Sequence, residues 1–201
     1  MQDTLNDISD ELCSFLMPLD FFYSKKKFKL PKIAPVTGSD LPETKRKLLA
    51  HKTDMTSTLT NHHGSDLYIE VLDNELNENY LLRMVVLKKL FDSKPVEFGA
   101  IGIDLSKLDK LMVEEIKEGI KPLGKLLELY NVKYASNPRA YFQIEIDEYI
   151  SKILDSPINE ISFGRCNEIT DNEGFTIADI VEVLPHSNWV IYLEPLINYL
   201  R

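Results

Sequence analysis

After Gly64 the hydrophobic pattern of the chain becomes an alternation with a period of two residues, and this feature limits the possible folds most strongly. Alternating apolar and polar side chains are typical of β-strands with one buried face. Six segments show the pattern: 66–73, 80–91, 95–105, 138–147, 160–170 and 175–185. Short turns such as DSKP and DNEG join neighbouring segments, so these strands should pair antiparallel. We therefore predict an α+β protein with a six-stranded antiparallel sheet flanked by helices.

Helical periodicity predicts the elements around these strands. Residues 4–17 have apolar positions at helical spacing. A second helical region covers residues 42–63, with a break near HKTD, an N-cap at Thr53 or Asp54, and Gly64 as its stop. A third helix ends at Gly119, and Pro122 opens a fourth.

The two ends of the chain lack these clear patterns. The proline-rich stretch that follows the first helix, up to residue 41, indicates a loop or arm. The tail from residue 187 to 201 indicates a short closing helix or a strand and helix. We therefore divide the chain into an N-terminal helix and arm, residues 1–41, and one main domain, residues 42–201.

Charge and cysteine content exclude several classes of function. The net charge of −9 argues against binding to nucleic acid or to an anionic membrane, because both require a clustered positive field. The two cysteines, Cys13 and Cys166, are far apart and form no metal or disulfide framework. The N-terminus is acidic, unlike a signal peptide, and no window of 18 residues is apolar and uncharged. These observations predict a cytoplasmic protein.

A loose group of metal-type side chains lies in the second helical region. His51, Asp54, His62 and His63 do not have the spacing of a known zinc motif, and the two adjacent histidines face different directions on a helix. We interpret them as capping and surface residues, and predict neither a metal nor an organic cofactor. Nucleotide-binding glycine motifs and the GxSxG motif of hydrolases are also absent from the sequence.

Arg83 stands in the middle of an apolar strand segment. On a strand it shares one face with Leu81, Val85 and Leu87, which should be buried. A buried guanidinium remains charged and costs several kcal/mol unless an anion pairs with it. Two alternatives remain at this point. Either an anion, from the protein or from a ligand, meets Arg83, or the side chain lies at an edge and reaches water.

Glu182 is the acidic counterpart of Arg83. It shares one strand face with Ile180 and Leu184, and the other face also carries one acid, Asp179, so the pattern does not determine which face is buried. If Glu182 points inward, it either pairs with Arg83 or lines the same cavity as a separate polar group. A further candidate is KPLGKLL, residues 121–127, where a helix begins and free backbone N–H groups could receive an anion or hydroxyl, unless this is an ordinary helix start.

Taken in order, seven motifs resemble the chorismate lyase-like family over about residues 45–186: HKTDMTSTLTNHHG, YLLRMVVL, KPVEFGAIGIDL, KPLGKLL, NPRAYFQIE, FGRCNEIT and ADIVEVLP. This family includes the chorismate pyruvate-lyases. The resemblance implies a six-stranded antiparallel sheet and a buried ligand cavity closed by two helical flaps. It also implies conversion of chorismate to 4-hydroxybenzoate and pyruvate, by a carbon–oxygen lyase that needs no cofactor.

The resemblance also assigns roles to individual residues. Arg83 would hold the ring carboxylate, and Glu182 would contact the oxygen at the para position. The remaining substrate-binding residues would be Met55, Leu123, Gly124 and Arg139.

Two rival functions and the oligomeric state remain open in the sequence. One rival is a non-catalytic domain that senses small aromatic acids, as in transcription regulators, although the first 40 residues are too few for the usual DNA-binding domain. The other is a lyase for a different chorismate-like acid. A homodimer is one alternative for the assembly, and we predict no nucleic-acid or membrane partner.

Overall fold

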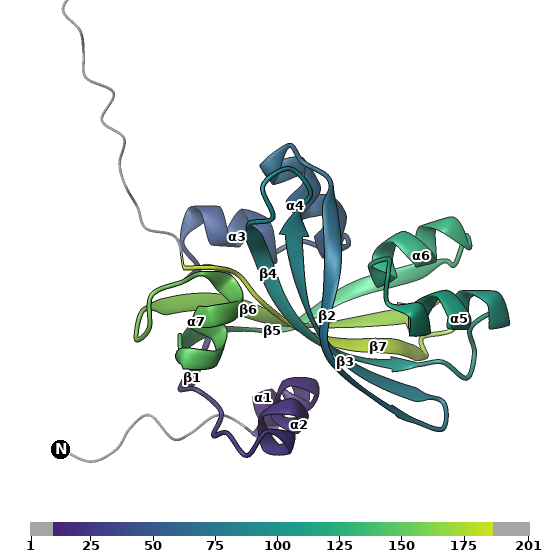
Figure 1. Cartoon of the computed structure of the whole chain (residues 1–201), viewed down its shortest axis with the longest axis horizontal. Helices are drawn as coiled ribbons and strands as arrows, with labels where there is room; N and C mark the ends of the chain where they lie inside the picture. Colours follow the sequence, from purple (N-terminus) through teal and green to yellow (C-terminus); the bar gives the residue numbers. More distant parts are fainter. Residues whose placement is uncertain (1–9, 187–201) are drawn as a thin grey trace, which may run out of the picture.

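The computed structural model describes residues 10–186, and its strands form a single sheet (Figure 1). The strands are β1 (Ile33–Val36), β2 (Leu67–Asn77), β3 (Tyr80–Lys89), β4 (Pro95–Asp104), β5 (Tyr134–Glu145), β6 (Ile161–Asp171) and β7 (Thr176–Val183). Their order across the sheet is β1-β5-β6-β7-β4-β3-β2, and each neighbouring pair is antiparallel. The α+β class and the antiparallel pairing are confirmed, but the sheet has seven strands and not six.

Helices cover both faces of this sheet. They are α1 (Asp10–Phe15), α2 (Met17–Lys25), α3 (Glu43–Leu49), α4 (Met55–His63), α5 (Lys110–Glu118), α6 (Leu123–Leu129) and α7 (Glu148–Leu154). On one face, α1, α2 and α7 pack against strand residues such as Met84, Phe98 and Val181. Leu19 and Phe22 of α2 are completely buried there, and each contributes about 1.5–3 kcal/mol through burial. This layer joins the N-terminal helices to the core of the sheet.

The other face of the sheet carries two separate apolar clusters. The α5–α6 cluster contains Leu81, Ile101 and Ile103 from the strands, together with side chains of α5 and α6. The α3–α4 cluster contains Leu87 and Leu184 from the strands, together with side chains of α3 and α4. Figure 1 shows these two helix pairs over different parts of the sheet. Space between the two clusters is therefore where a ligand could reach the sheet.

The stretch that the sequence indicated as a loop or arm is partly regular. It contains α2, which has Pro18 in its first turn, and β1, which pairs with β5 at the edge of the sheet. Proline is compatible with both positions, because a first helical turn and an edge strand each leave backbone N–H groups unused. The prolines that predicted a loop therefore mark a helix start and an edge strand. Helix α7 is a further element that the sequence pattern did not predict.

Several predicted helix boundaries are confirmed. Asp54 caps α4, because its Oδ1 accepts a hydrogen bond of 2.7 Å from the backbone N–H of Ser57. Gly64 and Gly119 end α4 and α5 with φ of 60° and 69°, a left-handed conformation that glycine adopts at little cost. Helix α6 begins directly after Pro122. The predicted first helix begins at Asp10 within the described range, and the tail from residue 187 lies outside it.

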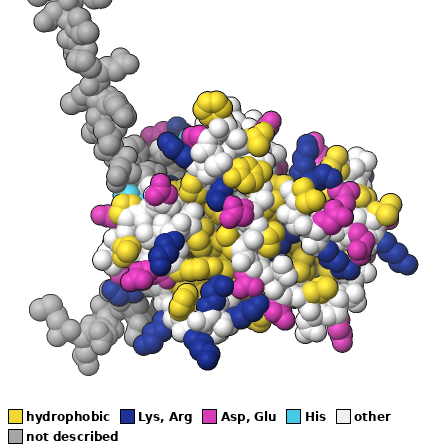
Figure 2. All heavy atoms as spheres, viewed as in Figure 1, with side chains coloured by type: hydrophobic (Ala, Val, Ile, Leu, Met, Phe, Trp, Pro, Cys, Tyr) yellow, Lys and Arg dark blue, Asp and Glu magenta, His cyan; other side chains and the backbone are white. Residues whose placement is uncertain are grey.

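The remaining expectations concern the surface and metal binding. On the face seen in Figure 2, basic and acidic side chains are interspersed, without a broad area of one sign. Residues 10–186 contain no group of three or more side chains suited to hold a metal ion. In the same range, no helix has the length and hydrophobicity needed to cross a membrane. Cys13 and Cys166 are both free thiols.

Candidate ligand-binding site

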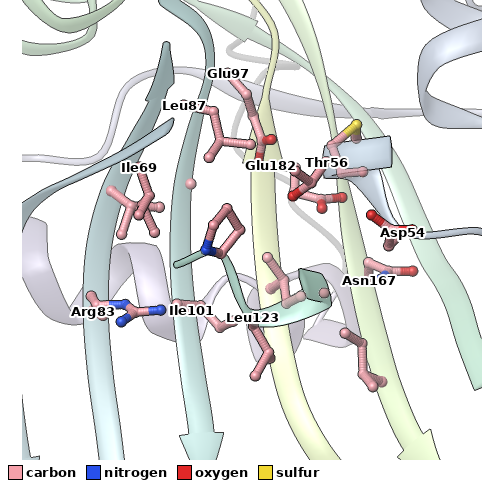
Figure 3. Close-up of a pocket in the computed structure, with 17 residues that line it drawn as sticks. Asp54, Thr56, Ile69, Arg83, Leu87, Glu97, Ile101, Leu123, Asn167 and Glu182 are labelled. Atoms are coloured by element: carbon pink, nitrogen blue, oxygen red, sulfur yellow. The ribbon is translucent and has the colours of Figure 1, made fainter. Parts of the chain in front are cut away.

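A pocket lies on the sheet between the α3–α4 and α5–α6 clusters (Figure 3). Its floor comes from β2, β3, β4, β6 and β7, and the first residues of α4 and α6 complete its wall. Most of the lining is apolar. The lining residues are Asp54, Met55, Thr56, Ile69, Arg83, Val85, Leu87, Glu97, Gly99, Ile101, Pro122, Leu123, Gly124, Asn167, Ile169, Ile180 and Glu182.

Arg83 enters this pocket from β3. As the period of two predicts, Val85 and Leu87 line the pocket with it, whereas Met84 packs on the opposite face of the sheet. The Arg83 side chain is 2% exposed, and its Nη1 donates a hydrogen bond of 2.8 Å to the backbone carbonyl of Ile116. Burial lowers the pKa of Arg83 to about 10, which leaves the guanidinium charged at neutral pH.

The charge of Arg83 is not matched by a protein carboxylate in the described part of the chain. Its Nε has no hydrogen-bond partner, and none of the ion pairs formed within residues 10–186 includes it. Burial of a cation without a partner anion is costly. Arg83 therefore presents a buried positive charge and an unused Nε donor at the pocket.

The opposite end of the pocket contains an ion pair. Glu182, on β7, accepts a hydrogen bond from Nε of Arg165, which lies directly opposite it on β6. Arg165 is completely buried, and its Nη1 also donates to the backbone carbonyls of Leu49, at 3.0 Å, and His51, at 3.1 Å. These two residues belong to the end of α3 and the connection to α4. One guanidinium thus fixes the Glu182 carboxylate and the segment that leads to α4.

Glu97 is a second carboxyl group at the same end of the pocket. It is 4% exposed, and its Oε2 has no hydrogen-bond partner in residues 10–186. Burial raises the pKa of Glu97 well above its usual range, the charge of Glu182 raises it further, and Arg165 opposes the shift. Burial and the neighbouring carboxylate therefore both favour the neutral form of Glu97. Asn167 is also buried at the pocket, but Ser136 satisfies its amide through bonds of 3.1 and 3.2 Å.

Helices α4 and α6 begin next to each other at the pocket. Met55 is the first residue of α4, Leu123 is the first residue of α6, and both line the pocket. Gly124 allows the close approach, because a Cβ at this position would lie 3.2 Å from the Asp54 side chain. Asp54, Thr56 and Pro122 also line a wider groove on the outer side of these two helix starts. The groove and the pocket therefore share one rim.

The structure brings together five of the six site residues expected from the sequence. They are Arg83, Glu182, Met55, Leu123 and Gly124. Glu182 points inward, which the sequence left open, and its ionic partner is Arg165 rather than Arg83. Figure 3 shows Arg83 and Glu182 in different parts of the pocket.

Arg139 does not line this pocket. It occupies the irregular position of β5 between Pro138 and Ala140, where the pairing with β6 shifts. Its side chain is 45% exposed and forms an ion pair of 3.2 Å with Glu168. A bulge redirects the side chain at that position, so the expected second cation of the site points elsewhere.

Sequence reasoning missed two charged residues at this end of the pocket, Glu97 in its lining and Arg165 behind Glu182. Glu97 carries the signal that identified Arg83, namely a charged side chain inside a strand with apolar neighbours, whereas Arg165 shares its strand face with the polar Asn167. Glu97 shares its strand face with Gly99 and Ile101, and all three line the pocket. The same test, applied to every strand, would have found Glu97.

Comparison with known proteins establishes the fold. No family model matches the sequence, and no curated protein matches it. Among solved structures, the chain is similar to the effector domain of PhnF from Mycobacterium smegmatis, with a TM-score of 0.51, 10% identity, and coverage of 66% of this chain and 88% of that chain. It is also similar to PhnF from the same organism, with a TM-score of 0.52, 9% identity, and coverage of 84% of this chain and 93% of that chain. The chain therefore shares the fold of these two structures.

Proposed function

We propose that this protein binds a small organic acid with a single carboxylate, in the pocket between the α3–α4 and α5–α6 clusters. The observation that carries the proposal is the buried, unpaired guanidinium of Arg83. A ligand carboxylate would supply the missing anion, and a guanidinium can bind it through two parallel hydrogen bonds. The Nε of Arg83, which has no protein partner, is one available donor.

The charges in the pocket indicate the charge of the ligand. Arg165 and Glu182 form an ion pair, and burial favours the neutral form of Glu97, so the unpaired cation of the pocket is Arg83. Asp54, at the rim, uses its carboxylate to cap α4. A monoanion would therefore leave the interior neutral, whereas a dianion would bring a second charge without a cation.

The walls of the pocket indicate the shape of the ligand. Between Arg83 and the carboxyl groups the lining consists of apolar side chains, among them Ile69, Val85 and Ile101. An apolar body such as an aromatic ring would bury its surface there. The similarity to the effector domain of PhnF supports a binding role, because it shows the same fold in a domain that responds to an effector.

A second candidate function is that of a chorismate pyruvate-lyase. The ordered motifs favour it, as does the location of Arg83 and Glu182 in one pocket. In this reaction a proton leaves ring carbon C4, the ether bond from C3 to oxygen breaks, the ring becomes aromatic, and enolpyruvate leaves to form pyruvate. Glu97 could protonate the departing oxygen. Chorismate, however, has two carboxylates, and Arg139, the expected second cation, does not face the pocket.

One pair of experiments tests the proposal and separates the two candidates. Calorimetric titration at pH 7 should show that benzoate and 4-hydroxybenzoate bind, with Kd below about 1 mM. Incubation with chorismate, followed by assay of pyruvate and 4-hydroxybenzoate, should show no turnover above background if the protein only binds. Turnover that Arg83→Ala abolishes would establish the lyase instead. If neither acid binds and chorismate is not consumed, both functions are wrong.

A further inference from the structure

His51 lies in the connection between α3 and α4, and its imidazole ring contacts three parts of the protein. Its Nε2 lies 2.8 Å from the backbone carbonyl oxygen of Leu48, at the end of α3. Its Nδ1 accepts a hydrogen bond of 3.3 Å from the backbone N–H of Thr53 and lies 3.0 Å from the hydroxyl of the same residue. From the sheet, Nη1 of Arg165 lies 3.4 Å from this Nδ1. Both ring nitrogens therefore have partners inside the protein.

These partners determine which ring nitrogen carries the hydrogen. A backbone carbonyl only accepts hydrogen bonds, so Nε2 must donate to Leu48. The backbone N–H of Thr53 and the guanidinium of Arg165 only donate, so Nδ1 must accept. The contacts therefore require a neutral imidazole with its hydrogen on Nε2.

Protonation of the ring is incompatible with these contacts. A hydrogen on Nδ1 would point at two donors, and the ring would become a second cation next to Arg165. Burial lowers the pKa of His51, Arg165 of β6 lowers it further, and Glu182 of β7 opposes the shift. The other partners of the ring, Leu48 and Thr53, are uncharged. The folded protein therefore favours the neutral ring.

Two routes connect the ring of His51 to the pocket. The first is Arg165, because its Nε donates to Glu182, which lines the pocket. The second is Thr53, whose hydroxyl lies 3.2 Å from the hydroxyl of Thr58, in the first turn of α4. The first residue of that helix, Met55, also lines the pocket. A change at the ring therefore affects a polar group of the pocket and the helix start that forms part of its wall.

We propose that His51 is a positioning residue of the ligand-binding site: its neutral ring holds Arg165 and the start of α4 in the arrangement that binds the ligand, and protonation of the ring weakens binding. This inference rests on the proposed binding function and adds the regulation of that site by pH. The ligand-free protein accepts the proton more readily than the complex. Because linkage is reciprocal, the ligand lowers the pKa of His51, and affinity decreases as pH falls through that pKa.

Calorimetric titration with 4-hydroxybenzoate between pH 7.5 and pH 5 tests the effect on affinity. The ligand stays ionised in this range, because carboxylic acids titrate near pH 4. The two variants are His51→Gln, which keeps a donor for Leu48, and His51→Asn, which keeps an acceptor on the side of Arg165. From pH 7.5 to pH 5, the Kd of the wild type should rise at least about threefold more than the Kd of either variant. Other titrating groups, Glu97 among them, are present in all three proteins, so their effects cancel in this comparison.

A matched control is available on the same helix. His63→Gln changes a histidine at the far end of α4, where the charged neighbours of the ring are His62, Lys89 and Asp92. This variant should keep the pH dependence of the wild type. Thermal unfolding at pH 7.5 checks that every variant is folded.

NMR of the histidine rings in the wild type provides a second measurement, which a purely structural role would not affect. The ¹⁵N shifts of His51 at pH 7.5 should be those of a neutral ring with its hydrogen on Nε2. The midpoint of its titration should be lower with 4-hydroxybenzoate than without it, by about 0.5 pH unit or more, which corresponds to a threefold change in affinity. A residue that only supports the fold would have the same midpoint in both states.

The outcomes separate this inference from the proposed function. The inference is overturned if the wild type and both His51 variants share one pH dependence, or if the ligand leaves the midpoint of His51 unchanged. The proposed function stands in those cases, because the acid still binds. If the wild type binds neither benzoate nor 4-hydroxybenzoate, the proposed function is wrong and this inference falls with it. The NMR titration uses the wild type, so it decides the question even where a variant fails to fold.

Discussion

Two buried arginines lie at opposite ends of the pocket, Arg83 in its lining and Arg165 behind Glu182, and their surroundings differ. Arg165 has the Glu182 carboxylate and the carbonyls of Leu49 and His51 as partners, and its Nη2 has no partner in the described chain. Arg83 has one carbonyl, that of Ile116, and its Nε has no partner in the described chain. Both side chains are almost completely inaccessible, so burial alone does not distinguish them. Their hydrogen-bond partners distinguish them. Arg165 holds parts of the protein together, whereas the Nε of Arg83 has no protein partner and could bind a ligand.

The largest expected effect is the loss of stability in Arg165→Met. This change leaves Glu182 buried without its cation and removes the hydrogen bonds to the α3–α4 connection. Breaking a buried ion pair by removal of one partner costs about 3–5 kcal/mol. Urea denaturation should show a decrease of this size in the free energy of unfolding. A decrease below about 1 kcal/mol would mean that the two arginines are energetically alike.

Arg83→Met should weaken ligand binding without reducing the stability of the protein. Removal of an unpaired buried cation eliminates its desolvation cost, so the free energy of unfolding should stay the same or increase by about 1–2 kcal/mol. Binding of 4-hydroxybenzoate should weaken at least about hundredfold, because the charged hydrogen bonds to its carboxylate are lost. Denaturation and titration of the same preparation measure both quantities. Retained affinity would show that the ligand carboxylate lies elsewhere.

Glu97→Gln should change how stability depends on pH. The pKa of Glu97 is raised in the folded protein, so its stabilising contribution is complete below the ordinary value of 4.5 and is lost as pH rises towards the folded-state pKa. As pH rises above about 5, the wild type should therefore lose up to about 1.4 kcal/mol per pH unit relative to the variant.

The charged groups that face Glu97 are Glu182 from β7 and Arg165 from β6, and both remain in the variant. The difference between the two denaturation series therefore isolates Glu97. Parallel curves for the wild type and the variant would show that Glu97 is ionised throughout this range.

The smallest effect is expected for Arg139→Ala. Its ion pair with Glu168 is solvent-exposed on the arginine side and contributes about 0–1 kcal/mol. Affinity for 4-hydroxybenzoate should stay within about twofold of the wild type, because the side chain does not line the pocket. A loss of affinity comparable to that of Arg83→Met would show that Arg139 contributes to ligand binding, as the resemblance implied.

The sequence predicted most of the sheet and one end of the site, for a physical reason. Strand alternation assigns each side chain to a face without knowledge of its neighbours, so Arg83 could be located from β3 alone. The pairing of Arg165 with Glu182 required the register between β6 and β7. That register shifts by an irregularity next to the turn, between Ile169 and Thr170, and a shift of one residue exchanges the two faces of a strand.

The same limitation explains two other differences. Arg139 lies at the irregular position of β5, where alternation does not predict the direction of the side chain. Strand β1 was missed because it is short and contains Pro35, which only an edge strand tolerates. Local patterns thus identify elements and faces, but bulges and edges depend on the partner strand.

The position of Arg165 affects how future mutants of this protein should be interpreted. Because one guanidinium holds both Glu182 and the connection between α3 and α4, a change of Glu182 also loosens the base of a helix that lines the pocket. Loss of ligand binding in a Glu182 variant therefore has two combined causes: the lost carboxylate and the loosened helix. Arg165→Met removes the guanidinium that holds this connection and keeps the Glu182 carboxylate. Comparison of a Glu182 variant with Arg165→Met therefore separates the chemical contribution of Glu182 from its mechanical contribution.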